Sequence, residues 1–308
     1  MNSKIRVGLV YGGESPEHDV SLMTAKSIRE NIDANQFEII DIFIDKSGKM
    51  DESLLKNIDV AFLAVHGPNC EDGKLQKYLE DRNIKHTGSG VKASLINMDK
   101  VSMHDAFKTI ELPVVEYNGF DKNNIDSTKE YVEKIGLPVF IKPNNGGSSI
   151  GMTKVDTINN LEKAIHEAFK YDDKIIIEKA VVKPREIEVG VLGNNDLIIS
   201  EPGEVLSNGE FYSYETKYFK PFRTTTNAQL SEDQIGLIKN QSEKAYRATG
   251  CRGYARIDFF ISQNKLYINE INTLPGFTAI SMYPKLMANI GVGYKELITK
   301  IINLALEN

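Results

Sequence analysis

Short apolar runs alternate with helix-like periodicity in the first third of the chain. Residues 5–11 form an apolar run of strand length that a Gly-Gly pair ends, and apolar residues then recur at helical spacing over residues 22–32. Residues 37–44 and 60–65 have the same character of short buried strands. This alternation predicts a small α/β unit over residues 1–96, whose parallel sheet presents ligand groups at the carboxyl ends of its strands.

The pattern changes in the middle of the chain, where helical segments alternate with short strands. The sequence Asn-Asn-Gly-Gly-Ser-Ser-Ile-Gly at residues 144–151 lies between two strand-like stretches, which predicts a hairpin loop and not a strand-to-helix turn. We expect a second unit over residues 97–180, with helices over 100–110, 127–135 and 158–170 and strands over 139–142 and 174–178.

Strands dominate the remainder of the chain, residues 181–308. One long helix interrupts them, beginning at the N-cap Ser231 and ending at Gly250. The fold class is therefore α/β and α+β, in three tightly joined units without an internal repeat. Strands are predicted at 186–192, 197–200, 255–261 and 266–269, and two further helices begin near residues 281 and 293.

Composition and charge narrow the classes of function. A chain of 308 residues has room for two or three domains, and its net charge of −6 disfavours a protein that binds nucleic acid or an anionic membrane. No apolar run approaches the roughly 18 residues that span a bilayer, and the N-terminus lacks the pattern of a secretory signal. We expect a cytoplasmic protein with chemically inert cysteines at 70 and 251 and with surface histidines at 18, 86, 104 and 166.

Two glycine-rich stretches invite a nucleotide-binding interpretation, but neither matches a standard motif. The loop from Gly146 to Gly151 lacks the lysine of a P-loop. The match of Gly88-x-Gly90-x-x-Ala93 to a dinucleotide fingerprint follows a stretch that makes a poor strand. A nicotinamide-dependent dehydrogenase therefore stays a distant alternative.

Lysines beside the first of these loops favour phosphate binding. Lys142 ends the strand that enters the hairpin, and Lys179 follows the apolar run at residues 175–177. A lysine at the end of a buried strand can reach a phosphate as a point charge, and backbone N–H groups can cradle phosphates without a P-loop lysine. A phosphate site at the hairpin is one interpretation, and an ordinary surface hairpin with solvated strand ends is the other.

The best candidate for a metal site combines Asp258 with Glu270 and Asn272. Glu270 and Asn272 are two apart in one strand, so both side chains point to the same face, and a short turn makes this strand a hairpin with that of Asp258. Hard oxygen donors of this kind suit Mg²⁺. Arg256 shares the face of Asp258 and could stabilise developing negative charge. Polar residues on a solvated sheet face are the alternative.

Several short motifs follow one another along the whole chain. They are Gly12-Gly13-x-Ser15-x-Glu17, His66-Gly67 with Glu71-Asp72-Gly73, Thr87-Gly88-Ser89-Gly90, Met98-Asp99-Lys100, Lys142-Pro143 with Gly147-Ser148-Ser149-x-Gly151, Tyr212-x-Tyr214-Glu215-x-Lys217-Tyr218, Arg256-Ile257-Asp258 and Glu270-x-Asn272-Thr273-x-Pro275-Gly276. Together they resemble the D-alanine–D-alanine ligases of the ATP-grasp superfamily. The resemblance implies an ATP-grasp fold after an N-terminal parallel-sheet domain. ATP would lie between a central domain at 97–180 and a C-terminal domain at 181–308, which carries the metal site and a lid over 210–227.

The resemblance also implies roles for individual residues around ATP. Glu178 and the backbone near Val181 would meet adenine, and Glu186 would meet the ribose. Two Mg²⁺ ions per site, for which Mn²⁺ is an acceptable substitute, would be held by the candidate metal residues. The phosphates would be held by Lys100, Lys142, Lys179 and Lys217, and Ser148 and Ser149 would also bind ATP.

Other residues would bind and activate the two D-alanines. Glu17 would accept the ammonium of the first D-alanine and form a hydrogen-bonded group with Ser148 and Tyr218. Charge that develops during the reaction would be stabilised by Arg256 and by backbone N–H groups near Gly276. Ser281 and its neighbouring backbone would hold the carboxylate of the second D-alanine, and His66 and Met282 would be further substrate-binding residues.

The implied activity is the ATP-dependent ligation of two D-alanines for peptidoglycan precursor synthesis, through a D-alanyl phosphate. Tyr218 favours an amine nucleophile, since relatives that use D-lactate carry Phe at this position. The alternatives are a related ligase that takes D-lactate or D-serine as its second substrate and a binding protein without enzymatic activity. We expect a homodimer whose ligands are D-alanine and ATP.

Overall fold

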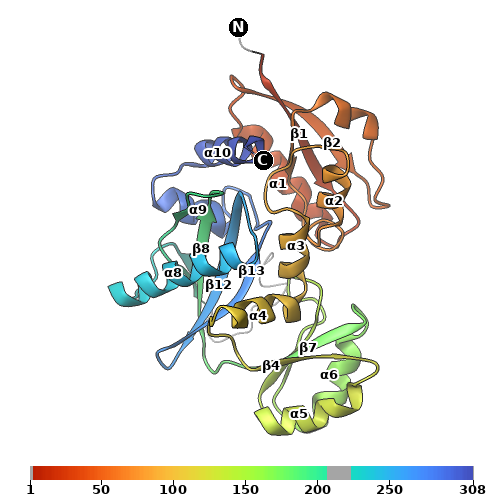
Figure 1. Cartoon of the computed structure of the whole chain (residues 1–308), viewed down its shortest axis with the longest axis vertical. Coiled ribbons are helices and arrows are strands. Elements are labelled where there is room, and N and C mark those ends of the chain that lie inside the picture. Colours follow the sequence, from red (N-terminus) through yellow and green to blue (C-terminus); the bar gives the residue numbers. More distant parts are fainter. Residues whose placement is uncertain (1–2, 207–222, 308) are drawn as a thin grey trace.

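The structure, a computed structural model that describes residues 3–206 and 223–307, contains three sheets in order along the chain (Figure 1). The first sheet is parallel, in the order β2-β1-β3, as the alternating pattern predicts. Its central strand is shielded on both faces, since Leu9 and Val10, which point to opposite faces, are both buried. The elements of this part are β1 (Ile5–Gly12), α1 (His18–Asn31), β2 (Phe37–Ile44), a 3-10 helix (Glu52–Asn57), β3 (Val60–Leu63), α2 (Lys74–Glu80) and α3 (Val91–Met98).

The second sheet is antiparallel, in the order β4-β7-β5-β6. Apolar residues of α6 recur at helical spacing, and Leu161, Ala164, Ile165 and Ala168 pack with β5 and β7 into one core. Residues 144–152 join β5 to β6, which confirms the predicted hairpin. The elements are α4 (Lys100–Thr109), β4 (Tyr117–Asp121), α5 (Thr128–Ile135), β5 (Val139–Pro143), β6 (Thr153–Val155), α6 (Leu161–Ala168) and β7 (Lys174–Lys179), with two 3-10 turns at Ile125–Ser127 and Ile158–Asn160.

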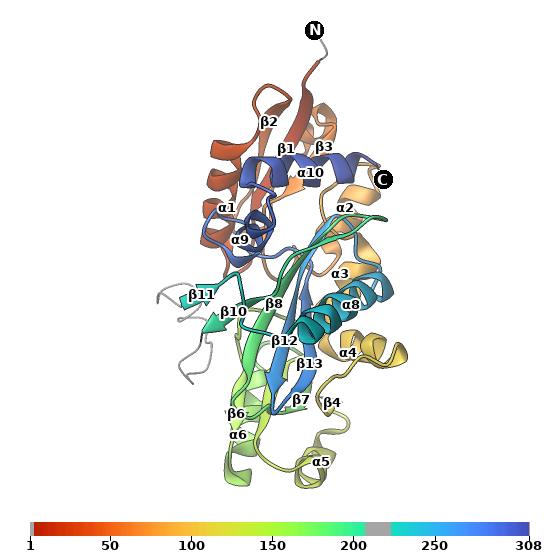
Figure 2. The same cartoon turned by 90° about the vertical axis from the view of Figure 1, so that its left-hand side faces the viewer.

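The third sheet is antiparallel, in the order β11-β10-β8-β12-β13, and β9 pairs with β8. Helices α4 and α8 lie together on one face of this sheet (Figure 2) and share a core with it. Ser231 begins α8 in a capping box with Gln234, and Gly250 follows its end at a φ of +73°, as predicted. The elements are β8 (Arg185–Leu192), β9 (Ile198–Ile199), β10 (Gly203–Leu206), β11 (Arg223–Thr225), α8 (Glu232–Ala248), β12 (Tyr254–Ser262), β13 (Lys265–Asn272), α9 (Met282–Asn289) and α10 (Tyr294–Leu306).

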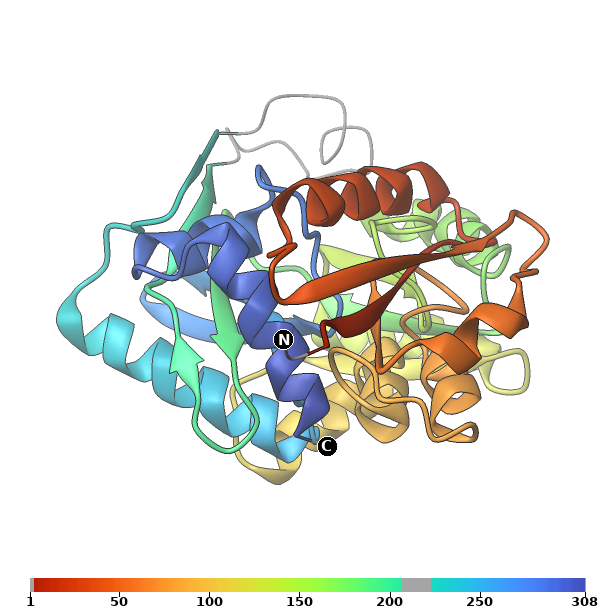
Figure 3. The same ribbon diagram turned by 90° about the horizontal axis from the view of Figure 1, so that it is seen from above.

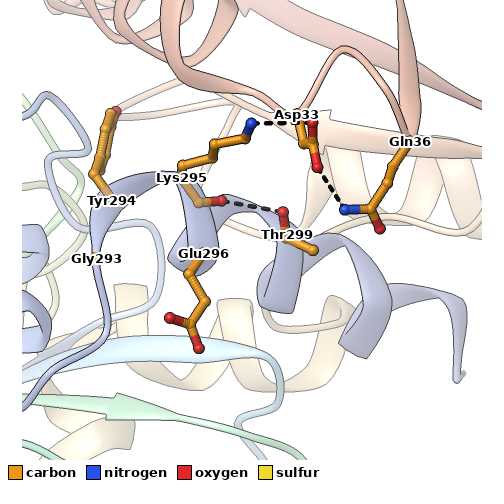
Figure 4. Close-up of a pocket in the computed structure, with 7 residues that line it drawn as sticks. All are labelled: Asp33, Gln36, Gly293, Tyr294, Lys295, Glu296 and Thr299. Carbon is orange, nitrogen blue, oxygen red and sulfur yellow. Dashed lines mark hydrogen bonds and ion pairs between the residues drawn. The ribbon is translucent and has the colours of Figure 1, made fainter.

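The last helix returns to the first sheet (Figure 3). Leu297, Ile298 and Ile301 of α10 are fully buried in the core that contains β1 and β3. At the rim of this contact, Lys295 forms an ion pair of 3.0 Å with Asp33, which also accepts a hydrogen bond from Gln36 (Figure 4). Helix α10, from the predicted range 181–308, thus belongs to the core of the first sheet, and α4, from the predicted range 97–180, belongs to the core of the third sheet. The division into domains at 1–96, 97–180 and 181–308 stays a prediction. Within the described residues, no helix has the length and apolar character to cross a membrane.

Truncation of an α10 anchor tests the contribution of this contact to stability. Leu297→Ala is expected to lower the free energy of unfolding by about 2–5 kcal/mol, because it removes a fully buried side chain and leaves a cavity between α10 and the first sheet. Urea unfolding followed by circular dichroism measures the change. Asn303→Ala, on the exposed side of the same helix, serves as the control and should change stability by less than about 0.5 kcal/mol. Equal effects of the two substitutions would contradict the assignment.

Candidate active site

A cavity of about 720 Å³ lies between the second and third sheets. Strands β5, β7, β8, β12 and β13 contribute to its walls, and the loop between β5 and β6 contributes a further side. The structure brings together here the predicted residues Lys100, Lys142, Ser148, Ser149, Glu178, Lys179, Val181, Glu186, Arg256, Asp258 and Glu270.

Lys142 and Glu178 form a buried ion pair on neighbouring strands, with 2.6 Å between Lys142 Nζ and Glu178 Oε2. The other oxygen of Glu178 lies 3.2 Å from His104 Nε2, which comes from α4. Burial by itself would raise the pKa of Glu178, but the charge of Lys142 and the hydrogen bonds from His104 and Lys142 hold that pKa well below its usual range. Both oxygens of the carboxylate are therefore engaged by protein donors.

Lys100 is the first residue of α4 and lies at the base of the hairpin loop. Its ammonium donates to the carbonyl of Gly146, and its own N–H donates to the carbonyl of Asn144. Burial lowers the pKa of this lysine, and the nearby positive charge of Lys142 acts in the same direction, against the opposing effect of Glu270. Two ammonium groups thus face one cavity, an arrangement that attracts an anion.

The hairpin loop has an unusual backbone. Ser148 and Ser149 adopt φ angles of +54° and +59°, which cost non-glycine residues on the order of 1–3 kcal/mol each. Ser148 Oγ donates a hydrogen bond of 2.6 Å to Glu17 Oε1, immediately before α1, so the loop is tied to the first sheet. Glu17 is also closely approached by the segment after β3. A Cβ at Gly67 in that segment would lie 2.2 Å from the hydroxyl of Ser15 and 2.9 Å from the carboxylate of Glu17, so this position requires glycine.

Three carboxylates form a row across the third sheet. The antiparallel register places Asp258 of β12 opposite Glu188 of β8 on one side and opposite Glu270 of β13 on the other. Arg256 donates to both oxygens of Asp258 at 2.7 Å, and its Nε lies 3.4 Å from Glu188 Oε2. Although burial opposes the positive charge, Asp258 and Glu188 raise the pKa of Arg256 well above its usual value.

This row fits a divalent cation, although it does not form a complete set of ligands. Asp258 and Glu270 are cross-strand neighbours, and Asn272 Nδ2 donates to Asp258 Oδ2 at 2.9 Å, so the three predicted metal residues lie together. In residues 3–206 and 223–307, no three His, Cys, Asp or Glu side chains are placed to hold a metal by themselves. Carboxylates completed by substrate phosphates and water are typical of Mg²⁺ sites.

A second group of predicted residues lies beyond the residues that line the cavity. Ser281, at the start of α9, accepts a hydrogen bond from the backbone of Thr278 at 3.1 Å and precedes the buried Met282. A Cβ at Gly276 would lie 3.2 Å from Ser281 Oγ, so these residues form one compact loop. The backbone of Ala279 donates to Ser27 of α1 at 3.3 Å, which joins the loop to the first sheet.

His66 follows the end of β3 and is buried between two partners. Its Nε2 lies 3.0 Å from the hydroxyl of Thr24, and its Nδ1 lies 3.5 Å from Glu71 Oε1. Burial raises the pKa of Glu71, and the negative charge of Glu17 raises it further. The carboxylates of Glu17 and Glu71 are thus close enough to influence each other, which favours a positively charged ligand group beside them.

Comparison with known proteins identifies the family. The model of the D-alanine–D-alanine ligase N-terminus matches residues 6–53 and 49–89, and that of the C-terminus matches residues 106–303. The chain belongs to the D-alanine–D-alanine ligase family. It is 39% identical to the D-alanine–D-alanine ligase of Caldicellulosiruptor bescii, across 99% of this chain and 96% of the relative.

Solved structures agree with the family and confirm the predicted ATP-grasp fold class. The VanG D-Ala:D-Ser ligase of Enterococcus faecalis superimposes with a TM-score of 0.90 at 30% identity, over 98% of this chain and all of that one. The D-alanine–D-alanine ligase of Bacillus anthracis, solved in complex with ATP, gives a TM-score of 0.85 at 29% identity, over 98% of both chains.

Two residues expected in a ligase of this family, Lys217 and Tyr218, lie outside the described residues, as does most of the predicted lid. Lys179 lines the cavity, but its ammonium donates to the carbonyls of Gly136 and Leu137 at 2.9 Å. Gly88, from the weak dinucleotide fingerprint, is packed against the C-terminal part of the chain, since a Cβ there would lie 3.1 Å from Leu274.

The expectation that most histidines lie at the surface is wrong for three of the four. His18, His86 and His104 are buried, and only His166 is exposed. The ring of His104 packs against Tyr117, with 4.7 Å between ring centroids, and this contact holds His104 Nε2 within hydrogen-bond distance of Glu178. The sequence contains a signal for this position of His104. It follows Lys100 by four residues in the same helix, and this spacing places both side chains on one face.

Glu188 was also missed. The alternation in β8, in which Glu186 and Glu188 flank the fully buried Ile187, was the available signal that both carboxylates face the cavity.

Replacing Glu178 with Gln is expected to lower the free energy of unfolding near neutral pH by about 3–5 kcal/mol, because Lys142 becomes a buried charge without its carboxylate. The difference in free energy of unfolding between Glu178→Gln and the unmodified protein should become smaller at acidic pH. Since the pKa of Glu178 is lowered in the folded protein, its stabilising contribution is complete above the unfolded value of roughly 4.3 and is lost as the pH falls below that value.

Urea unfolding of the two proteins at neutral pH and at about pH 3, more than a unit below the unfolded pKa, measures this difference. Glu162→Gln, on the exposed side of α6, is the control and should follow the unmodified protein at both pH values. A Glu178→Gln deficit that stays constant across this range would contradict the ion-pair argument.

Proposed function

We propose that this chain ligates two D-alanines to D-alanyl-D-alanine, with release of ADP and phosphate from ATP, as a step in peptidoglycan precursor synthesis. The observation that carries the proposal is the convergence of Lys100, Lys142, Arg256 and a carboxylate pair on one cavity, in a chain that belongs to the D-alanine–D-alanine ligase family. Cations for phosphate and carboxylates for metal in the same cavity are what phosphoryl transfer requires.

In this proposal the phosphates of ATP lie under the hairpin loop. Lys100 and Lys142 neutralise them, and Gly146 and Gly147, at which a Cβ would meet nothing within 4 Å, leave space for their approach. Because the ammonium of Lys179 already donates to two carbonyls, we assign that residue to the adenine end, together with Val181. Glu186, which also lines the cavity, would accept the ribose hydroxyls.

Asp258, Glu270 and Asn272 would hold Mg²⁺ in the proposed site. When bound, Mg²⁺ supplies positive charge that offsets the negative charge of the transferring phosphoryl group. Arg256, which lies beside the same residues, adds a fixed positive charge that needs no reorganisation during the reaction.

The two D-alanines would occupy the region between the loop, α1 and the start of α9. Glu17, with Glu71 near it, suits the ammonium of the first D-alanine, and the backbone around Gly276 and Ser281 suits the carboxylate of the second. His66 would help to orient the first substrate, and Met282 would pack beside the second.

The proposed reaction has two steps. The carboxylate of the first D-alanine attacks the γ-phosphorus of ATP, so that a P–O bond to ADP breaks and a D-alanyl phosphate forms. The amine of the second D-alanine then attacks the acyl carbon, loses a proton and displaces phosphate. Water must be excluded because it would hydrolyse the acyl phosphate, and the hydrogen bond between Ser148 and Glu17 would help to close the site.

We also propose that the protein is a homodimer, as the resemblance implies.

The assignment predicts release of phosphate that depends on D-alanine, ATP and Mg²⁺, together with formation of the dipeptide. Asp258→Asn is expected to lower kcat by on the order of 10²-fold or more, because it weakens the site for the cation that stabilises the transferring phosphoryl group. A phosphate assay with chromatographic detection of the dipeptide measures both, and circular dichroism controls for folding. A phosphate-release rate that is the same with and without D-alanine would overturn the assignment.

A related second substrate is the alternative function, because one of the similar structures is a D-Ala:D-Ser ligase. Competition of D-serine and D-lactate with D-alanine separates these activities. Tyr218→Phe is expected to raise the use of D-lactate relative to D-alanine by about tenfold, since the resemblance makes Tyr218 the residue that favours an amine. Tyr171→Phe, at an exposed position, is the control and should leave the ratio unchanged. No change in the ratio for Tyr218→Phe would remove Tyr218 from substrate choice.

A further inference from the structure

Arg256 lies between two carboxylates, only one of which has a proposed role. It donates to both oxygens of Asp258 at 2.7 Å, while its Nε is 3.4 Å from Glu188 Oε2. The side chains of Arg256 and Glu188 are 9% and 8% exposed. The guanidinium has little contact with solvent, and Asp258 and Glu188 are the carboxylates that lie against it.

The proposed metal site places a conflicting demand on Asp258. Its two oxygens already accept two hydrogen bonds from Arg256 and one from Asn272. A divalent cation on Asp258 would use some of the same lone pairs and would lie close to a fixed positive charge, whose repulsion is strong in a buried site. Binding of the cation thus favours a loosened contact between Asp258 and Arg256.

A loosened Arg256 needs another anion, because a buried charge without a partner is strongly unfavourable. Glu188 is opposite Asp258 in the register of β8 and β12, and it already lies beside the same Nε. A small rotation of the guanidinium would lengthen the contact with Asp258 and shorten the contact with Glu188.

We propose that Glu188 is a positioning residue that takes over Arg256 when a divalent cation binds Asp258, so that cation binding does not leave the arginine unpaired. This inference rests on the metal site of the proposed function. Glu188 thereby acts through Arg256 and not as a ligand of the ion.

A double-mutant cycle on the full chain tests the proposal. Mn²⁺ affinity is measured by electron paramagnetic resonance in the presence of a non-hydrolysable ATP analogue, for the unmodified protein, Glu188→Gln, Arg256→Met and the double variant. We expect Glu188→Gln to weaken Mn²⁺ binding by about 10- to 100-fold, the range typical of residues that support metal ligands. In the Arg256→Met background the same substitution should change the affinity by less than about twofold, because no arginine competes for Asp258.

Glu204→Gln is the matched control, because Glu204 is a buried carboxylate of the same sheet that pairs with Arg185 and not with Arg256. It should leave Mn²⁺ affinity unchanged. Equal weakening by Glu188→Gln in both backgrounds would show that Glu188 acts through its own charge on the ion, and unchanged affinity in the first background would remove its role. Either result overturns the proposal.

The measurement needs no ligation of D-alanine, so the outcomes separate. Absence of Mn²⁺ binding to the unmodified protein would overturn the metal site, and with it this inference. If the four proteins show the expected Mn²⁺ affinities but the unmodified protein does not ligate D-alanine, only the ligase assignment is overturned.

Discussion

The requirement that buried charges be paired determines the arrangement of the active-site cavity. Three of the cations that line it lie beside carboxylates: Lys142 pairs with Glu178, Arg256 pairs with Asp258 and Glu188, and Lys100 is near Glu270. These pairs connect α4 with the second and third sheets, so the positions of the two sheets are coupled through charge as well as through apolar packing. An anionic ligand would enter a cavity whose positive groups are already held in place, which reduces the reorganisation that binding requires.

A second coupling runs through the hairpin loop. Its two serines keep a left-handed backbone while Ser148 reaches across to Glu17 at the start of α1. Local strain of this kind persists only where surrounding contacts hold it, and here one of those contacts comes from another sheet. The first sheet thus takes part in shaping the loop over the cavity, although none of its strands lines the cavity.

Much of this arrangement could be predicted from the sequence. Period-two spacing placed Glu270 and Asn272 on one face, and the loop composition predicted the hairpin at residues 144–151. Motifs spread along the whole chain predicted the family. Strands β4, β10 and β11 were not predicted, because their short polar or glycine-containing sequences become strands only by pairing with neighbours. The support that His104 gives Glu178 also depends on tertiary contact, since the two residues are far apart in the chain.

The return of α10 to the first sheet affects the order in which the protein can fold during its synthesis. Strands β1 and β3 emerge early from the ribosome, but the helix that covers part of their core is made after the two other sheets. Until then, apolar surface of the first sheet stays exposed to solvent and to other nascent chains. Folding from the N-terminus in independent steps, which is common for multidomain proteins, is therefore incomplete here until α10 has been synthesised.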